Sequence, residues 1–182
     1  SDMPLKGMHH WKNAMVILAM ADALGLPRQA VLSVLQTFTG LSHRCELVAV
    51  REGVTWVNDS KATNVAATVA AIQSLSVVCA QRLVLIMGGE GKDADFSPLK
   101  VVFEEHVALV ILIGKDADAI ASVVPSTCSK QYAESLPDAV KKAAMFVSNG
   151  DIVALSPACA SFDMFSNYEE RGKAFGHCVS EL

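Results

Sequence analysis

Two short, continuously apolar runs constrain the fold of this chain more than any other feature of its sequence. The runs are Leu83-Val84-Leu85-Ile86-Met87 and Leu109-Val110-Ile111-Leu112-Ile113, and neither contains a polar residue. A strand of this composition is buried on both faces, which is typical of a parallel sheet covered by helices on either side. The two runs therefore predict a fold of the α/β class.

From Arg44 onward, stretches with strand patterns alternate with stretches with helix patterns. The expected strands are Cys45–Val50, Thr55–Val57, Leu83–Met87, Ala108–Ile113 and Ile152–Leu155. Helical patterns lie between and after them, at about 65–75, 99–105, 116–123, 136–147 and 169–181. This alternation predicts a mostly parallel sheet with helices on both faces.

The sequence before Arg44 has a different character. Helical patterns cover Trp11–Leu24 and a second segment from Pro27 to about Phe38, and Gly40-Leu41-Ser42 then interrupts the pattern. We expect a domain boundary at residues 40–44, with residues 1–42 forming a short helical piece of another domain. On this interpretation the chain is a fragment of a longer protein.

Composition excludes several classes of protein. With 182 residues, 52% of them apolar and 19% charged, the chain is long enough to form one good core. A net charge of −4 with 15 Lys and Arg argues against a nucleic-acid-binding protein. No apolar run reaches the roughly 18–20 residues that span a bilayer, so we expect no membrane segment. The five cysteines are odd in number and show no CxxC spacing, which favours a reducing, cytoplasmic location over disulfides or zinc.

Three of the expected strands end in polar or glycine-rich segments. These segments are Asn58–Asn64, Gly88–Phe96 and Ser156–Asp163. Ligands of open α/β sheets bind beyond the carboxyl ends of the strands. We therefore expect the three segments to converge at one edge of the sheet and to form a binding site there.

The segment Asn58–Asn64 connects an expected strand to an expected helix. Free backbone N–H groups and the positive end of the helix dipole favour an anion at such a junction. Asp59 and Lys61 add charges there, and Ser60 and Thr63 add hydroxyls. The alternative is that Ser60 or Thr63 only caps the following helix, while the charged side chains are solvated.

The glycine-rich segment supplies a flexible cation. Its glycines permit a ligand to approach the backbone closely, and Lys92 carries a charge suited to a carboxylate or a phosphate. The alternative is a turn with a solvated lysine. This segment is not a nucleotide P-loop, because GxxxxGK[ST] requires a glycine at Ile86 and a serine or threonine at Asp93.

Four motifs in this order resemble those of the Mur ligase family. They are His43-Arg44, Asn58-Asp59-Ser60-Lys61-Ala62-Thr63-Asn64, Gly88-Gly89-Glu90-Gly91-Lys92, and Leu155-Ser156-Pro157-Ala158-Cys159-Ala160-Ser161 followed by Asp163 and Phe165. The resemblance covers nearly the whole chain. Within the family it is strongest to the members that add D-glutamate. It implies the C-terminal end of the central ATPase domain at 1–42 and a complete, Rossmann-like C-terminal domain at 43–182.

The resemblance implies an ATP-dependent, amide-forming ligase of peptidoglycan precursor synthesis. Such an enzyme phosphorylates the carboxylate of UDP-N-acetylmuramoyl-L-alanine, and the amine of D-glutamate then attacks the acyl phosphate. ATP and Mg²⁺ would be the co-substrate and the metal of the full-length enzyme. The P-loop and the metal ligands would lie outside this chain, so we expect the isolated chain to be inactive. We also expect a monomer.

Individual residues match the family's sites by position. The D-glutamate pocket matches Thr63, Lys92, Ser161, Phe162 and Tyr168. Lys92 would pair with a substrate carboxylate, the two hydroxyls would hydrogen-bond its oxygens, and the two aromatic side chains would form walls, where leucine and phenylalanine are common in the family.

The residues that face ATP in the family match Asn13, Arg44, Asp59 and Lys61. Lys61 and Arg44 would take part in catalysis, and Asn13 would lie near the adenine. An arginine at a domain boundary can reach a phosphate when domains close, although position alone is equally compatible with a surface arginine.

Two other interpretations remain open. One is a different amino-acid-adding ligase of the same superfamily, such as a folylpolyglutamate synthase, although the run Ser156–Ser161 favours the D-glutamate enzyme. The other is a free-standing α/β binding module, such as a receiver domain. A receiver would need an acidic cluster at a strand end, and the two most apolar strands lack one.

Overall fold

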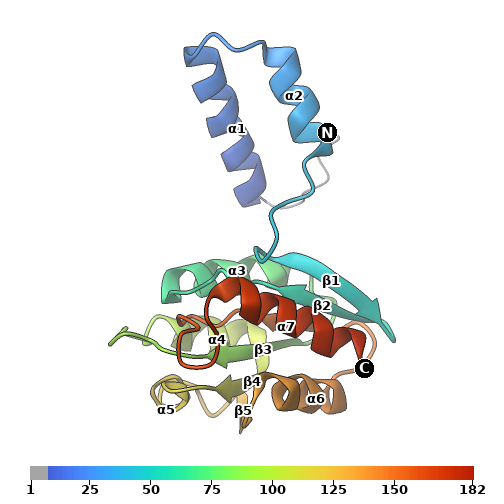
Figure 1. The fold of residues 1–182 in the computed structure, drawn as a ribbon. Helices are drawn as coiled ribbons and strands as arrows, with labels where there is room; N and C mark the ends of the chain where they lie inside the picture. The colour runs from blue at the N-terminus through green and yellow to red at the C-terminus, as the bar shows by residue number, and fades with distance from the viewer. Residues whose placement is uncertain (1–7) are drawn as a thin grey trace. The chain divides into compact units, whose positions relative to one another are not determined.

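The computed structural model of the chain describes residues 8–182, with side chains from Trp11 onward (Figure 1). The chain divides into two compact units, Ser1–Leu41 and Ser42–Leu182. Within its described part the first unit consists of helices α1 (Met8–Ala23) and α2 (Arg28–Thr37). Both helices were expected from the sequence, and α1 begins three residues earlier than its pattern indicated. Residues 1–7 of the expected segment 1–42 lie outside the described part.

The second unit is built on a six-stranded sheet with the strand order β1-β2-β6-β3-β4-β5. The strands are β1 (Glu46–Arg51), β2 (Val54–Asn58), β3 (Leu83–Gly88), β4 (Val107–Ile113), β5 (Ser129–Tyr132) and β6 (Ile152–Leu155). Only β1 pairs antiparallel with its neighbour, and all other pairings are parallel. The expected mostly parallel α/β sheet is confirmed.

Helices cover both faces of this sheet (Figure 1). The helices of the second unit are α3 (Val65–Val78), α4 (Leu99–His106), α5 (Ala117–Ala121), α6 (Leu136–Phe146) and α7 (Tyr168–Ser180). Alternate residues of β3 point to opposite faces: Leu85 packs with α3, α4 and α5, whereas Ile86 packs with α6 and α7. This explains the uninterrupted apolar runs, because neither face of a central strand meets water.

Strand β5 is the element that the sequence pattern did not predict. Its residues Ser129 to Tyr132 are all exposed and show no apolar alternation. β5 is the outermost strand on one side of the sheet and pairs only with β4. Backbone hydrogen bonds to β4, rather than side-chain burial, hold it in place. Within the described part of the chain, no helix is long and apolar enough to cross a membrane.

Candidate functional site

The carboxyl ends of four neighbouring parallel strands meet at one edge of the sheet. These strands are β2, β6, β3 and β4, in that spatial order. The segments that leave β2, β3 and β6 were expected to converge, and the structure confirms this. The segment Gly114–Asp116, which leaves β4, joins them and was not predicted.

The segments after β3 and β6 are joined by backbone hydrogen bonds. Glu90 N–H donates to Ala160 O at 3.0 Å, and Ala160 N–H donates to Glu90 O at 2.9 Å. Gly89 has a φ of 126°, and a Cβ at this position would overlap the carbonyl oxygen of Ala160. The glycine is therefore required for the two segments to approach this closely.

The short segment after β4, Gly114–Asp116, packs against the segments that follow β3 and β6. The N–H of Asp116 donates to Gly89 O at 3.0 Å, and its carboxylate accepts from Gly91 N–H at 2.6 Å. Lys115 N–H donates to the carboxylate of Asp163 at 2.9 Å. The sequence of Gly114–Asp116 alone does not indicate a binding site, because its role depends on which strands are neighbours in the sheet.

Arg171 on helix α7 ties the β2 and β6 segments together from below the surface. Its side chain is fully buried. The guanidinium donates to the hydroxyl of Ser60 at 3.0 Å and to the carbonyls of Ser60, Cys159 and Ala160 at 2.9, 3.1 and 3.3 Å. Burial lowers the pKa of Arg171 to about 10. The sequence signal for this residue is an arginine within the buried stripe of α7, four residues before Phe175.

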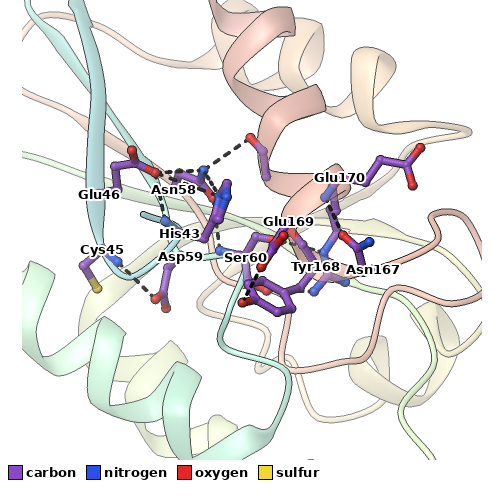
Figure 2. A network of polar contacts seen from close by, with 12 residues as sticks. His43, Cys45, Glu46, Asn58, Asp59, Ser60, Asn167, Tyr168, Glu169 and Glu170 are labelled. Carbon is purple, nitrogen blue, oxygen red and sulfur yellow. Dashed lines mark hydrogen bonds and ion pairs between the residues drawn. The ribbon is translucent and has the colours of Figure 1, made fainter. Parts of the chain in front are cut away.

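A polar network around Asn58 fixes the His43-Arg44 segment against the end of β2 (Figure 2). The side-chain amide of Asn58 donates to His43 Nδ1 at 2.9 Å and to Gly172 O at 3.2 Å, and its oxygen accepts from Ser60 N–H at 3.1 Å. His43 N–H donates to Glu46 Oε2 at 2.8 Å. Because Nδ1 accepts, we assign the imidazole proton to Nε2.

The carboxylate of Asp59 is held by protein groups (Figure 2). One oxygen accepts from Cys45 N–H at 3.1 Å, and the other accepts from the hydroxyl of Ser156 at 2.8 Å. Burial raises the pKa of Asp59 to about 6, although these hydrogen bonds and the charge of Arg44 lower it in part. A contact between Asp59 and ATP stays a prediction.

Two lysines of the expected sites lie over aromatic rings. The Nζ atom of Lys61 is 3.7 Å from the ring centroid of Tyr168, and that of Lys92 is 5.3 Å from the ring centroid of Phe162. The ring of Phe162 lies in the segment after β6, and that of Tyr168 begins helix α7. The backbone of Lys92 is left-handed, with a φ of 53°, a conformation that non-glycine residues adopt mainly where the surroundings enforce it.

The hydroxyls of Thr63 and Ser161 donate to no other residue in the part of the chain that the structure describes. The N-cap of α3 is Asn64, whose side chain accepts from Ala67 N–H at 2.9 Å, so the capping alternative for Ser60 or Thr63 is wrong. Ser60 instead donates to Tyr168 O at 2.7 Å. Within residues 8–182, neither Thr63 nor Ser161 donates its hydroxyl proton to another residue, which leaves both hydroxyls able to bind a ligand.

The remaining candidates lie in different places. Arg44 is exposed, beside Asp59. Asn13 is exposed on α1 of the first unit. Cys159 is fully buried, and burial raises its pKa to about 12, so its thiol is unsuited to nucleophilic chemistry. In the part of the chain that is described, no group of three or more His, Cys, Asp or Glu side chains could hold a metal ion.

Comparison with known proteins gives consistent matches. The family model for the Mur ligase glutamate ligase domain matches residues 43–159. A UDP-N-acetylmuramoylalanine–D-glutamate ligase from Hahella chejuensis is 49% identical over 180 residues, which is 99% of this chain and 40% of that protein. The enzyme of the same name from Nitrosococcus oceani is also 49% identical, over 39% of its length. The chain thus spans about two fifths of the length of these relatives.

Solved structures share the fold at low sequence identity. The folylpolyglutamate synthase of Mycobacterium tuberculosis, complexed with ADP, matches 97% of this chain with a TM-score of 0.75 and 20% identity, over 41% of its own length. The UDP-N-acetylmuramate–alanine ligase of Thermotoga maritima matches 98% of this chain with a TM-score of 0.70 and 17% identity, over 39% of its own length.

Proposed function

The chain belongs to the Mur ligase family, and on this premise we propose that it is the amino-acid-binding part of a D-glutamate-adding ligase. The complete enzyme would join D-glutamate to UDP-N-acetylmuramoyl-L-alanine at the expense of ATP. The strongest support is the 49% identity to D-glutamate ligases, which extends over 99% of the chain and includes the segment after residue 159.

The geometry at the sheet edge suits a dicarboxylic amino acid. Lys92 carries a positive charge, and in the described part of the chain the hydroxyls of Thr63 and Ser161 donate to no other residue. One ammonium and two hydroxyls can satisfy a carboxylate through charge-assisted and neutral hydrogen bonds. Phe162, in the segment after β6, and Tyr168, at the start of α7, would pack against the carbon chain of the substrate.

The β2 side of the same edge suits the phosphates of ATP. The carboxylate of the uridine substrate attacks the γ-phosphorus and ADP leaves; the amine of D-glutamate then attacks the acyl carbon and phosphate leaves. Lys61 and Arg44 would stabilise the negative charge that develops on the transferred phosphoryl group. Asp59 would hold the Arg44 segment in place through Cys45, and Asn13 would lie near the adenine.

ATP turnover would also need a P-loop and Mg²⁺. The chain has no GxxxxGK[ST] motif, and its described residues hold no cluster of metal ligands. We propose that other parts of the complete enzyme supply the P-loop and the ligands of Mg²⁺.

We assign residues 1–42 to the end of a central ATPase domain. The first unit exposes large apolar side chains that a solvated helix pair would not be expected to show. Met15, Met20, Leu24 and Val34 are each 60% exposed or more. Apolar surface of this kind marks a contact with further protein.

A panel of amino acids tests the proposed function in the ligase that contains this chain. Phosphate release with ATP and UDP-N-acetylmuramoyl-L-alanine is expected with D-glutamate and not with L-glutamate. A folylpolyglutamate synthase, which shares the fold, would instead use L-glutamate with a folate acceptor. Turnover with that pair and none with D-glutamate would refute the proposal.

A further inference from the structure

We infer that Tyr168 positions the ammonium of Lys61 for the phosphate of its co-substrate, in addition to forming a wall of the amino-acid pocket. This inference rests on the proposed function and extends it. The observation behind it is the 3.7 Å separation between Lys61 Nζ and the centroid of the Tyr168 ring. That distance is well inside the roughly 6 Å within which an ammonium is attracted to an aromatic face.

Tyr168 lies close to Ser60 and His43 (Figure 2), and both of these residues are linked to Lys61 through the backbone. Its carbonyl accepts the hydroxyl proton of Ser60, the residue before Lys61, at 2.7 Å. Its ring meets the ring of His43 edge-on, with centroids 6.0 Å apart at an interplanar angle of 81°. The carbonyl of His43 in turn accepts from Lys61 N–H at 3.0 Å. Tyr168 is therefore linked to Lys61 in two ways, through Ser60 and through His43. These contacts restrict movement of the ring relative to the backbone of Lys61.

Tyr168 is also the first residue of helix α7, and the start of that helix is capped. Asn167 accepts from Glu170 N–H at 2.8 Å, and the phenol of Tyr168 donates to Glu169 at 2.9 Å. Three turns of the helix follow, including the buried Arg171, whose guanidinium holds Ser60. The aromatic side chain is thus mounted on a rigid element rather than on a free loop.

An aromatic partner has a specific consequence for the charge of the lysine. A carboxylate would neutralise the ammonium and would compete with an incoming phosphate, whereas a ring orients the ammonium and leaves its full charge. In the described chain, Lys61 forms no ion pair with a carboxylate. Lys115 and Lys142, by contrast, pair with Glu90 and Asp138 at 3.3 and 2.7 Å.

Lys92 and Phe162 repeat the arrangement in weaker form. Their separation is 5.3 Å, and Phe162 is 63% exposed. Lys92 likewise has no carboxylate partner within residues 8–182. The two lysines proposed to bind anions therefore both lie over aromatic rings, and Tyr168 is the more buried of the two rings.

The placement itself is tested on the 182-residue chain by NMR. Protons above a ring face are shifted upfield, so the Hε resonances of Lys61 should lie upfield of those of the exposed Lys100 and Lys173. Tyr168→Leu should remove the upfield shift, whereas the same change at the chain's other tyrosine, Tyr132→Leu, should leave it. Lys61 resonances at the exposed-lysine position in the unsubstituted chain would overturn the inference.

The functional consequence is tested in the ligase that contains the chain. Tyr168→Leu should raise the KM for ATP by about three- to tenfold, and Tyr168→Phe, which keeps the ring, should restore most of the affinity. A residue that acted only as a wall of the amino-acid pocket would change the KM for D-glutamate alone. Tyr132→Leu is the control and should change neither constant.

Lys61→Ala separates failure of the inference from failure of the proposed function. If Lys61→Ala raises the KM for ATP and Tyr168→Leu does not, the positioning role is wrong and the proposed function stands. If Lys61→Ala itself leaves the KM for ATP unchanged, the assignment of this edge to ATP is wrong, and the inference falls with it.

Discussion

At the scale of single residues, Asp59 links the folding of the site to pH. Asp59 is 7% exposed, its carboxylate accepts hydrogen bonds from Cys45 and Ser156, and burial raises its pKa from 3.8 to about 6. A raised pKa means that the folded chain binds this proton more tightly than the unfolded chain does. The contribution of Asp59 to stability is therefore full below pH 3.8 and is lost as the pH rises towards 6.

Asp59→Asn should remove this pH dependence. An asparagine can still accept from Cys45 N–H and can donate to Ser156, but it does not ionise. Between pH 3.8 and 6 the free energy of unfolding of the unsubstituted chain should fall, relative to the variant, by up to about 3 kcal/mol. Urea titrations at several pH values measure the difference. Parallel pH profiles for the two proteins would contradict the assigned burial of the charge.

The sequence indicates the proposed ligand-binding residues better than it indicates the residues that support them. Lys92 was proposed from its glycine-rich segment, and Thr63 and Ser161 were proposed from the resemblance to the Mur ligases. Asn58, Arg171 and Ser156 could not be assigned their roles, because each depends on a contact between residues that are 97 or more positions apart. The bond from Ser156 to Asp59, for example, joins residues 97 positions apart.

At the scale of elements, helix α7 holds the β2 and β6 segments together through Arg171. Arg171→Met should lower the free energy of unfolding by about 2–4 kcal/mol, because at least two buried carbonyls and one hydroxyl lose their donor. Lys173→Met, an exposed position on the same helix, should change stability by less than about 0.5 kcal/mol. Thermal and chemical unfolding of both variants provide the measurement. Equal stability of the two variants would show that the guanidinium does not tie the segments together.

The elements themselves were largely predictable, and the exceptions have physical causes. The central strands β3 and β4 carry uninterrupted apolar runs, since they are buried on both faces. Strand β5 was missed because it is an exposed edge with the sequence Ser-Lys-Gln-Tyr, and only its register with β4 makes it a strand. For the same reason, the sequence did not predict the part that the segment 114–116 takes in the site. That segment reaches the site only because β4 lies next to β3 in the sheet.

At the scale of the whole molecule, the chain should bind but not catalyse. Phosphoryl transfer relies on positioned phosphates and a metal, and this sequence lacks the loop that positions them. The purified 182-residue chain should release no phosphate from ATP above the background of a Lys61→Ala variant. Turnover that depends on Lys61 would contradict this expectation and would place a complete ATPase site within the chain.

The central claim is that one edge of the sheet binds the amino acid through Lys92, and a pair of Michaelis constants tests it most directly. In the ligase that contains this chain, Lys92→Ala removes a charge-assisted hydrogen bond worth roughly 1.5–3 kcal/mol. The KM for D-glutamate should then rise about ten- to hundredfold while the KM for ATP changes far less. Lys100→Ala, an exposed lysine on α4, should leave both constants unchanged. If the KM for D-glutamate does not rise in the Lys92→Ala enzyme, or rises no more than the KM for ATP, Lys92 does not bind the amino acid.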